Sequence, residues 1–260
     1  MPKSAWGEVR AALGATDTVH RVELKVMLDN RLRDIVEGLG LREDSARGCE
    51  VYYWDDADLT FRRHGLIIRS RLATVGRTEL VTKLRASSPR RLPKVVARLP
   101  ALAVELDALP HRTQWSASVK HAVNTVGDLE APYSRDAFLG LLSPQQRIFL
   151  AKSTGRGRAL RDALAGEILP RGPVSVLKLV GSLPRLPRFV VESWHFPDGR
   201  QLLELSVKCK PKQCERTVIA LRKLFAASDI RPCRSQRMKT DISLRHLRWD
   251  SAARAQPIGA

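Results

Sequence analysis

Charged residues alternate with apolar ones in several short stretches of this chain, and these stretches hold the residues best suited to chemistry. The clearest is residues 20–27, H-R-V-E-L-K-V-M, in which Arg21, Glu23 and Lys25 occupy every second position. Successive side chains of a strand point to opposite faces, so the charged and apolar residues lie on opposite sides. One such stretch is typical of any half-buried strand, but its repetition along the chain indicates a shared charged surface.

The alternating positions supply two chemical groups, cations and carboxylates. Arginine grips phosphate oxygens in a bidentate fork, and lysine does so as a point charge. The cations are Lys25, Arg69, Arg71, Lys83, Arg85, Lys178 and Lys208. The carboxylates are those of Glu23, Glu105, Glu192 and Glu204. Because carboxylate oxygens suit Mg²⁺ or Mn²⁺, which bridge phosphates, the two groups together predict a phosphate-binding cavity with a divalent metal ion.

The elements that must position these residues are strands, with helices between some of them. Strands are predicted at 20–27, 49–55, 65–72, 79–85, 101–107, 174–180, 189–196 and 201–209, and helices at 28–41, 136–142, 144–152 and 213–227. A sandwich buries the inner faces of both sheets, and buried charges are costly unless they are paired or bound to a ligand. A closed barrel with charged side chains in its lumen and helices over its apolar outer face fits better.

The domain organisation follows from changes in composition and residue pattern along the chain. We expect an N-terminal arm at 1–18, one tunnel domain at 19–243 with a helical insertion at about 111–170, and a disordered tail at 244–260. Residues 87–100 contain three prolines and are predicted as a basic loop that does not continue the sheet.

Composition indicates a globular protein with a strong attraction for anions. The chain has 260 residues, 43% hydrophobic, with 45 Lys and Arg against 27 Asp and Glu, a formal net charge of +18. Such a field attracts any polyanion and does not choose among them. No apolar run reaches the roughly 18 residues that span a bilayer, and residues 1–8 show no apolar export signal, so we expect a cytoplasmic protein. The four cysteines are therefore expected to be free thiols.

The order of these stretches resembles the CYTH domain, the family of triphosphate tunnel metalloenzymes. The resemblance covers residues 18–243 and includes V-E-L-K at 22–25, G-L-I-I-R-S-R-L at 65–72, T-K-L-R at 82–85, V-E-L-D at 104–107 and the hairpin at 190–208. It implies an α+β fold built on a closed eight-stranded antiparallel tunnel. It also implies a triphosphate-bearing substrate, a divalent metal and, in most members, hydrolysis.

The resemblance assigns roles to individual residues. It implies phosphate binding by Lys25, Arg69, Arg71, Lys83, Lys178 and Lys239, metal binding by Glu23, Glu192 and Glu204, and a part in catalysis for Glu23, Glu105 and Lys83. Two positions depart from the family pattern. Arg21 stands where the opening E-x-E-x-K motif has its first carboxylate, and Ser206 stands where the last strand usually has a second one.

Three hypotheses for function remain open at this point. The first is a metal-dependent phosphohydrolase acting on a triphosphate or a longer polyphosphate. The second is a tunnel that binds polyphosphate or a nucleotide without hydrolysing it, because in-line attack on phosphorus needs a metal to position water and spread charge. The third is nucleic-acid binding by the basic exterior. It is the least favoured, because the chain has only 5% aromatic residues for base stacking.

Overall fold

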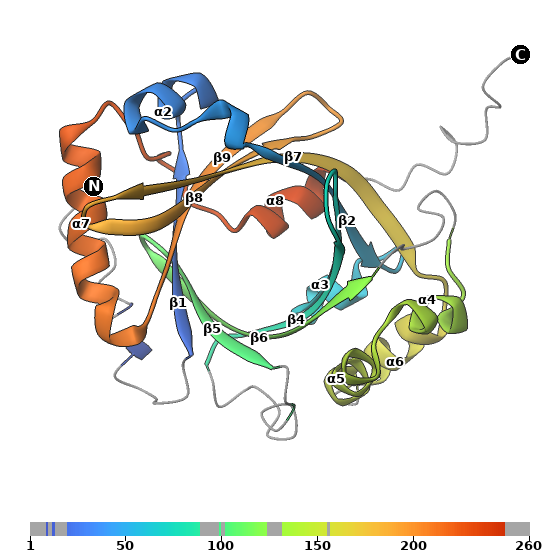
Figure 1. Ribbon diagram of the computed structural model, residues 1–260. Helices are drawn as coiled ribbons and strands as arrows, with labels where there is room; N and C mark the ends of the chain where they lie inside the picture. Colours follow the sequence, from blue (N-terminus) through green and yellow to red (C-terminus); the bar gives the residue numbers. More distant parts are fainter. Residues whose placement is uncertain are drawn as a thin grey trace, which may run out of the picture.

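The computed structural model shows a closed β-barrel with helices packed mainly outside it (Figure 1). The structure describes residues 20–88, 102–123, 132–154 and 157–247, together with residues 9, 12, 13 and 99. Most of the predicted N-terminal arm, most of the predicted basic loop at 87–100 and all of the chain after residue 247 lie outside these residues.

Within the described residues, nine strands close the barrel in the order β1-β5-β6-β4-β3-β2-β7-β8-β9. Their bounds are β1 Arg21–Leu28, β2 Arg47–Asp55, β3 Leu66–Ala73, β4 Thr78–Ala86, β5 Ala103–Leu109, β6 Arg112–Val123, β7 Leu169–Leu183, β8 Leu186–His195 and β9 Gln201–Cys209.

The prediction of eight antiparallel strands was wrong in both number and direction. Eight neighbouring pairs are antiparallel, but β1 and β5 run parallel, with Glu23 opposite Asp107. The two errors have one cause, because a closed ring with an odd number of strands cannot alternate direction throughout. At least one neighbouring pair must then be parallel.

The strand missing from the prediction is β6, which occupies the first part of the segment expected to be helical. Its sequence, R-T-Q-W-S-A-S-V-K-H-A-V, places serine and alanine at its centre, and these small residues give a weak signal for a strand. The helices are confined to α4 Arg135–Leu141, α5 Pro144–Thr154 and α6 Arg158–Ala165, and β7 begins at Leu169. The helical segment is therefore shorter than 111–170.

The outer face of the barrel is covered by two groups of helices. Helices α2 Leu32–Leu39 and α7 Cys214–Ala227 lie over one side, where Val22, Leu24 and Val26 are fully buried. Helices α4, α5 and α6 lie over another side, where Phe138 and Phe149 pack against apolar residues of β2, β3, β4 and β6. The apolar face predicted for residues 20–27 is thus confirmed as the outer, helix-covered wall.

Helix α8, Lys239–His246, lies within the outline of the barrel in Figure 1 and fills part of its interior. Its Leu244 packs with Met27, Tyr53 and Trp194, and Leu247 belongs to the same apolar cluster. Met27 shares the β1 face of Glu23 and Lys25, so this cluster occupies the lumen beyond the charged residues. Residues 244–247 are therefore folded, although they were predicted to begin a disordered tail.

Among the described residues, no helix is long and apolar enough to cross a membrane.

Candidate functional site

A cavity of about 540 Å³ lies inside the barrel and is lined by all twelve residues to which the sequence analysis assigned a binding, metal or catalytic role. They are Glu23, Lys25, Arg69, Arg71, Lys83, Arg85, Glu105, Lys178, Glu192, Glu204, Lys208 and Lys239. The first eleven come from seven strands of the barrel, and Lys239 is the first residue of α8. The alternation of strand side chains explains this convergence, because every second residue of each strand points into the lumen.

The cavity wall carries more positive than negative charge. Among the described residues that line it, eleven are Lys or Arg and five are Glu. Four of the charged residues were not assigned a role from the sequence: Arg21, Glu79, Lys120 and Arg188. An excess of cations in an enclosed, low-dielectric space focuses the field on any anion that enters.

Asp107 is a further site residue to which the sequence prediction gave no role. It is fully buried, and its two carboxylate oxygens accept hydrogen bonds from Lys25 and Lys83, each at 2.8 Å. Burial opposes ionisation, but the two lysines outweigh it and hold the pKa of Asp107 well below its usual value. Asp107 was identifiable from the V-E-L-D stretch, because it shares the strand face of Glu105.

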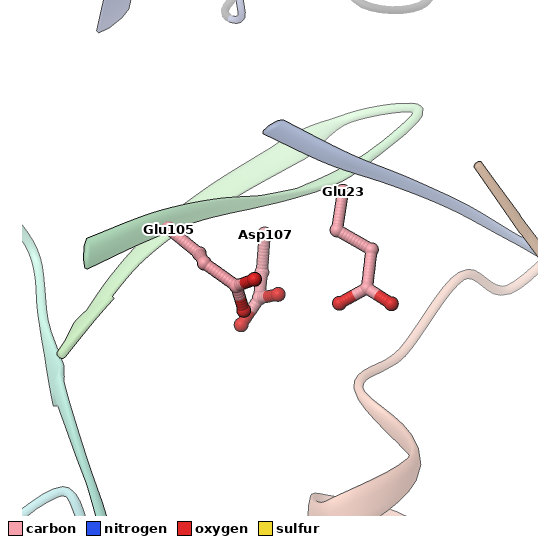
Figure 2. A group of neighbouring side chains, drawn as sticks. All are labelled: Glu23, Glu105 and Asp107. Atoms are coloured by element: carbon pink, nitrogen blue, oxygen red, sulfur yellow. The ribbon is translucent and has the colours of Figure 1, made fainter. Parts of the chain in front are cut away.

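Glu23, Glu105 and Asp107 form one group of carboxylates, with an oxygen of each within 4.8 Å of the others. Figure 2 shows Glu105 and Asp107 on β5 and Glu23 on the neighbouring strand β1, with their carboxylates on the same side. Lys25 lies 3.0 Å from Glu23, and Lys208 lies 2.9 Å from Glu105. Burial favours the neutral acid, yet the charges of Lys25 and Lys208 lower the pKa of Glu23.

Glu192 and Glu204 form a second acidic pair on the adjacent strands β8 and β9, directly opposite each other in register. Both accept hydrogen bonds from the Lys239 ammonium, at 2.6 Å for Glu204, and Arg71 lies 3.2 Å from Glu192. Burial opposes ionisation of Glu192, but Lys239 and Arg71 bring its pKa well below the usual value. The other oxygen of Glu204, Oε2, is buried without a hydrogen-bond partner in the described part of the chain.

The three carboxylates predicted to share one metal ion, Glu23, Glu192 and Glu204, do not form one such group in the described structure. Glu23 instead groups with Glu105 and Asp107, while Lys239 occupies the space between Glu192 and Glu204. The β1–β9 register explains the separation, because Met27 lies opposite Glu204 and Glu23 is four residues further along β1, opposite Lys208.

Some cations of the cavity have no ion-pair partner in the described part of the chain. Arg69 and Lys178 make no such contact, and Arg69 Nε is shielded from solvent without a hydrogen-bond acceptor. The pKa of Lys178 is lowered by burial and then by the nearby charge of Arg71. These two side chains are free to bind an anion that enters the cavity.

Arg85 marks the end of the cavity next to α8. It is bonded to Asp241 of that helix at 3.2 Å. Lys208, with 41% of its side chain exposed, is the more open residue and pairs with Glu105. The cavity thus meets folded protein at α8 and becomes more open near Lys208.

Comparison with solved structures supports the fold. A candidate adenylyl cyclase from Hippeastrum, described as having a dominant triphosphatase activity, matches with a TM-score of 0.59 and 12% sequence identity over 86% of this chain and 96% of that one. A candidate adenylate cyclase from Bacillus halodurans matches with a TM-score of 0.50 and 13% identity, over 86% and 97% of the two chains. Neither the protein-family models nor the curated protein sequences gave a match. The predicted resemblance to the CYTH fold is confirmed at the level of fold.

Proposed function

We propose that this protein binds a triphosphate- or polyphosphate-bearing anion in its tunnel and hydrolyses it with Mg²⁺ or Mn²⁺. The observation that carries the proposal is the cavity itself, where eleven cations among the described residues surround about 540 Å³, and where Arg69 and Lys178 have no ion-pair partner among those residues. A linear phosphate chain presents several closely spaced charges, which suits cations that converge from many strands. The fold shared with the Hippeastrum triphosphatase supports the same class of ligand.

The carboxylate group of Glu23, Glu105 and Asp107 fits a hard divalent cation, because it offers oxygen donors within 4.8 Å of one another. When bound, such an ion neutralises the developing charge on the phosphoryl group and lowers the pKa of a coordinated water. In this proposal Arg69, Arg71 and Lys178 hold the phosphate chain, with Lys25, Lys208 and Lys239 around them. Lys83, whose pKa is lowered by burial, stabilises charge on the reacting phosphate from its place beside Asp107.

A non-catalytic binding protein is the second candidate, and a specific observation favours it. Each carboxylate of the metal-binding candidate group already contacts a lysine, so an ion has to compete with Lys25, Lys83 and Lys208. Arg21, which lines the same cavity, adds a positive charge at the position where the CYTH family, which this chain resembles, has a carboxylate. These contacts weaken metal binding without weakening anion binding.

Two paired measurements on the purified protein test the proposal. Thermal unfolding with tripolyphosphate reports binding, and phosphate release with and without Mg²⁺ or Mn²⁺ reports hydrolysis. We expect stabilisation that is lost in Arg69→Ala and Lys83→Ala but kept in Arg158→Ala, whose side chain is 88% exposed on α6. Phosphate release should depend on the metal ion and fall by orders of magnitude in Glu105→Gln.

The outcomes separate the candidate functions. Tripolyphosphate binding without any phosphate release from triphosphates indicates the binding protein. Sequence-independent nucleic-acid binding that falls steeply with salt and is unchanged in Lys83→Ala indicates a protein that binds nucleic acid through its basic exterior.

A further inference from the structure

A second basic cavity lies outside the barrel, between α7 and the turn that joins β7 to β8. It measures about 580 Å³ and is lined on one side by Arg216, Ile219 and Lys223 of α7, and on the other by Arg185 and Leu186. Figure 1 shows α7 along the outside of the barrel, beside the ends of β8 and β9. We call this cavity the α7 groove.

All the charged residues that line the α7 groove in the described part of the chain are cations. Five of its described lining residues are cations, and none is acidic: Arg185, Arg188, Lys208, Arg216 and Lys223. Arg185, Arg216 and Lys223 are exposed and make no ion pair within the described part of the chain. Arg216 and Lys223 are seven residues apart, which places them about two turns apart along the same face of the helix. A strip of unpaired cations beside aliphatic residues is suited to a flexible polyanion.

The groove adjoins the tunnel cavity. Arg188 and Lys208 line both, so two cations lie where the cavities meet. Lys208 connects the two by contacting Glu105 inside the tunnel while remaining 41% exposed.

We propose that the α7 groove binds the distal part of a long inorganic polyphosphate chain whose end occupies the tunnel. This inference rests on the proposed function and narrows its substrate class, because a triphosphate is too short to need a second basic cavity of this size. The tunnel then selects a phosphate end, and the groove selects chain length.

The composition of the groove favours polyphosphate over single-stranded nucleic acid. Its described lining contains no aromatic residue, and the apolar side chains present are aliphatic, such as Leu186, Ile219 and Ala220. Proteins that bind single strands combine a basic groove with aromatic rings on which the bases stack. A polyphosphate chain has no bases and needs only the cations.

The test compares a triple variant, Arg185→Ala, Arg216→Ala and Lys223→Ala, with wild type. These residues line the groove but not the tunnel cavity. The charge-matched control is Arg33→Ala, Arg42→Ala and Arg158→Ala, whose side chains are 68%, 80% and 88% exposed elsewhere. Each protein is titrated calorimetrically with tripolyphosphate, with polyphosphate of several tens of phosphates, and with a single-stranded RNA oligonucleotide lacking a 5′-phosphate. Circular dichroism verifies folding.

We expect the groove variant to bind long polyphosphate about tenfold more weakly than wild type and to show a shallower salt dependence, since exposed contacts are screened by salt. Its tripolyphosphate affinity should stay within twofold, and the control should match wild type throughout. Unchanged affinity for long polyphosphate in the groove variant overturns the inference while leaving the proposed function intact. A groove variant that loses RNA binding selectively also overturns the inference. Failure of wild type to bind tripolyphosphate overturns the proposed function, and the inference with it.

Discussion

Two groups of carboxylates lie in the tunnel, and they are neutralised in different ways. Glu23, Glu105 and Asp107 are paired with Lys25, Lys83 and Lys208, which come from strands of the barrel. Glu192 and Glu204 share a single lysine, Lys239, which comes from helix α8.

The two groups therefore differ in whether their ion pairs depend on the sheet alone or also on the position of α8. The first group forms its ion pairs wherever the barrel is closed, because both partners are in the sheet. In the second group, Glu192 also pairs with Arg71 of β3, but both ion pairs with Lys239 depend on α8. That helix is held by the apolar contacts of Leu244 and by the pairing of Asp241 with Arg85. The first group is thus part of the rigid wall, and the second is the place where charge changes if α8 moves. Four predictions test this comparison.

The largest effect is expected for Asp107→Asn. The change leaves Lys25 and Lys83 buried beside an amide that cannot neutralise them, and breaking a buried pair in this way typically costs about 3–5 kcal/mol. Urea unfolding at pH 7 measures the loss. Asp162→Asn, at an exposed pair on α6, is the control and should change the unfolding free energy by less than about 0.5 kcal/mol. A loss below about 1 kcal/mol for Asp107→Asn contradicts the idea of a rigid wall.

Lys239→Ala should destabilise the protein less, by about 2–3 kcal/mol at pH 7, because Glu192 keeps its ion pair with Arg71. The pKa of Glu192 lies well below the ordinary value of 4.5 in the folded state, so its stabilising contribution is present above about pH 4.5 and is lost as the pH falls further. The variant has already lost part of that contribution. The difference in the free energy of urea unfolding between wild type and variant should therefore become smaller from pH 7 to pH 3. A difference that does not change with pH contradicts this account.

The third prediction asks which carboxylate group holds the metal. If it is the group on β1 and β5, Glu105→Gln should raise the Mn²⁺ concentration for half-maximal phosphate release by about tenfold or more, and Glu192→Gln by less than about threefold. Excess chelator should abolish release in both proteins and in wild type. A larger increase of that Mn²⁺ concentration in Glu192→Gln than in Glu105→Gln places the metal beside Lys239, in agreement with the ligand set implied by the family resemblance.

The smallest effect is expected for Arg21→Glu, which adds a carboxylate next to the first group. Arg21 lies opposite Glu105 in the β1–β5 register and lines the cavity. We expect Mn²⁺ to bind about twofold to fivefold more tightly and tripolyphosphate more weakly, each by less than about 1 kcal/mol, because Arg21 is exposed. Arg21→Gln separates the loss of a positive charge from the gain of a carboxylate ligand, since it removes the charge without adding a ligand. Equal Mn²⁺ affinity in both variants rules out a ligand role for position 21.

The sequence by itself determined which side chains share the lumen. Alternation along a strand is local, because it depends only on backbone geometry and on which face is apolar. For this reason the outer wall of Val22, Leu24 and Val26 and the convergence of the predicted residues on one cavity were both predictable.

Only the tertiary structure decided which carboxylate meets which cation. That choice depends on the register between strands distant in sequence. Closing nine strands requires a parallel pair, and only the structure shows that it is β1 with β5, in the register that places Glu23 beside Asp107. The choice depends also on where α8 packs, which places Lys239 between Glu192 and Glu204. Strand register and the position of α8 are set by the packing of the whole barrel, so a local sequence pattern does not predict them. Strand β6 was not predicted either, because the small residues at its centre give only a weak strand signal.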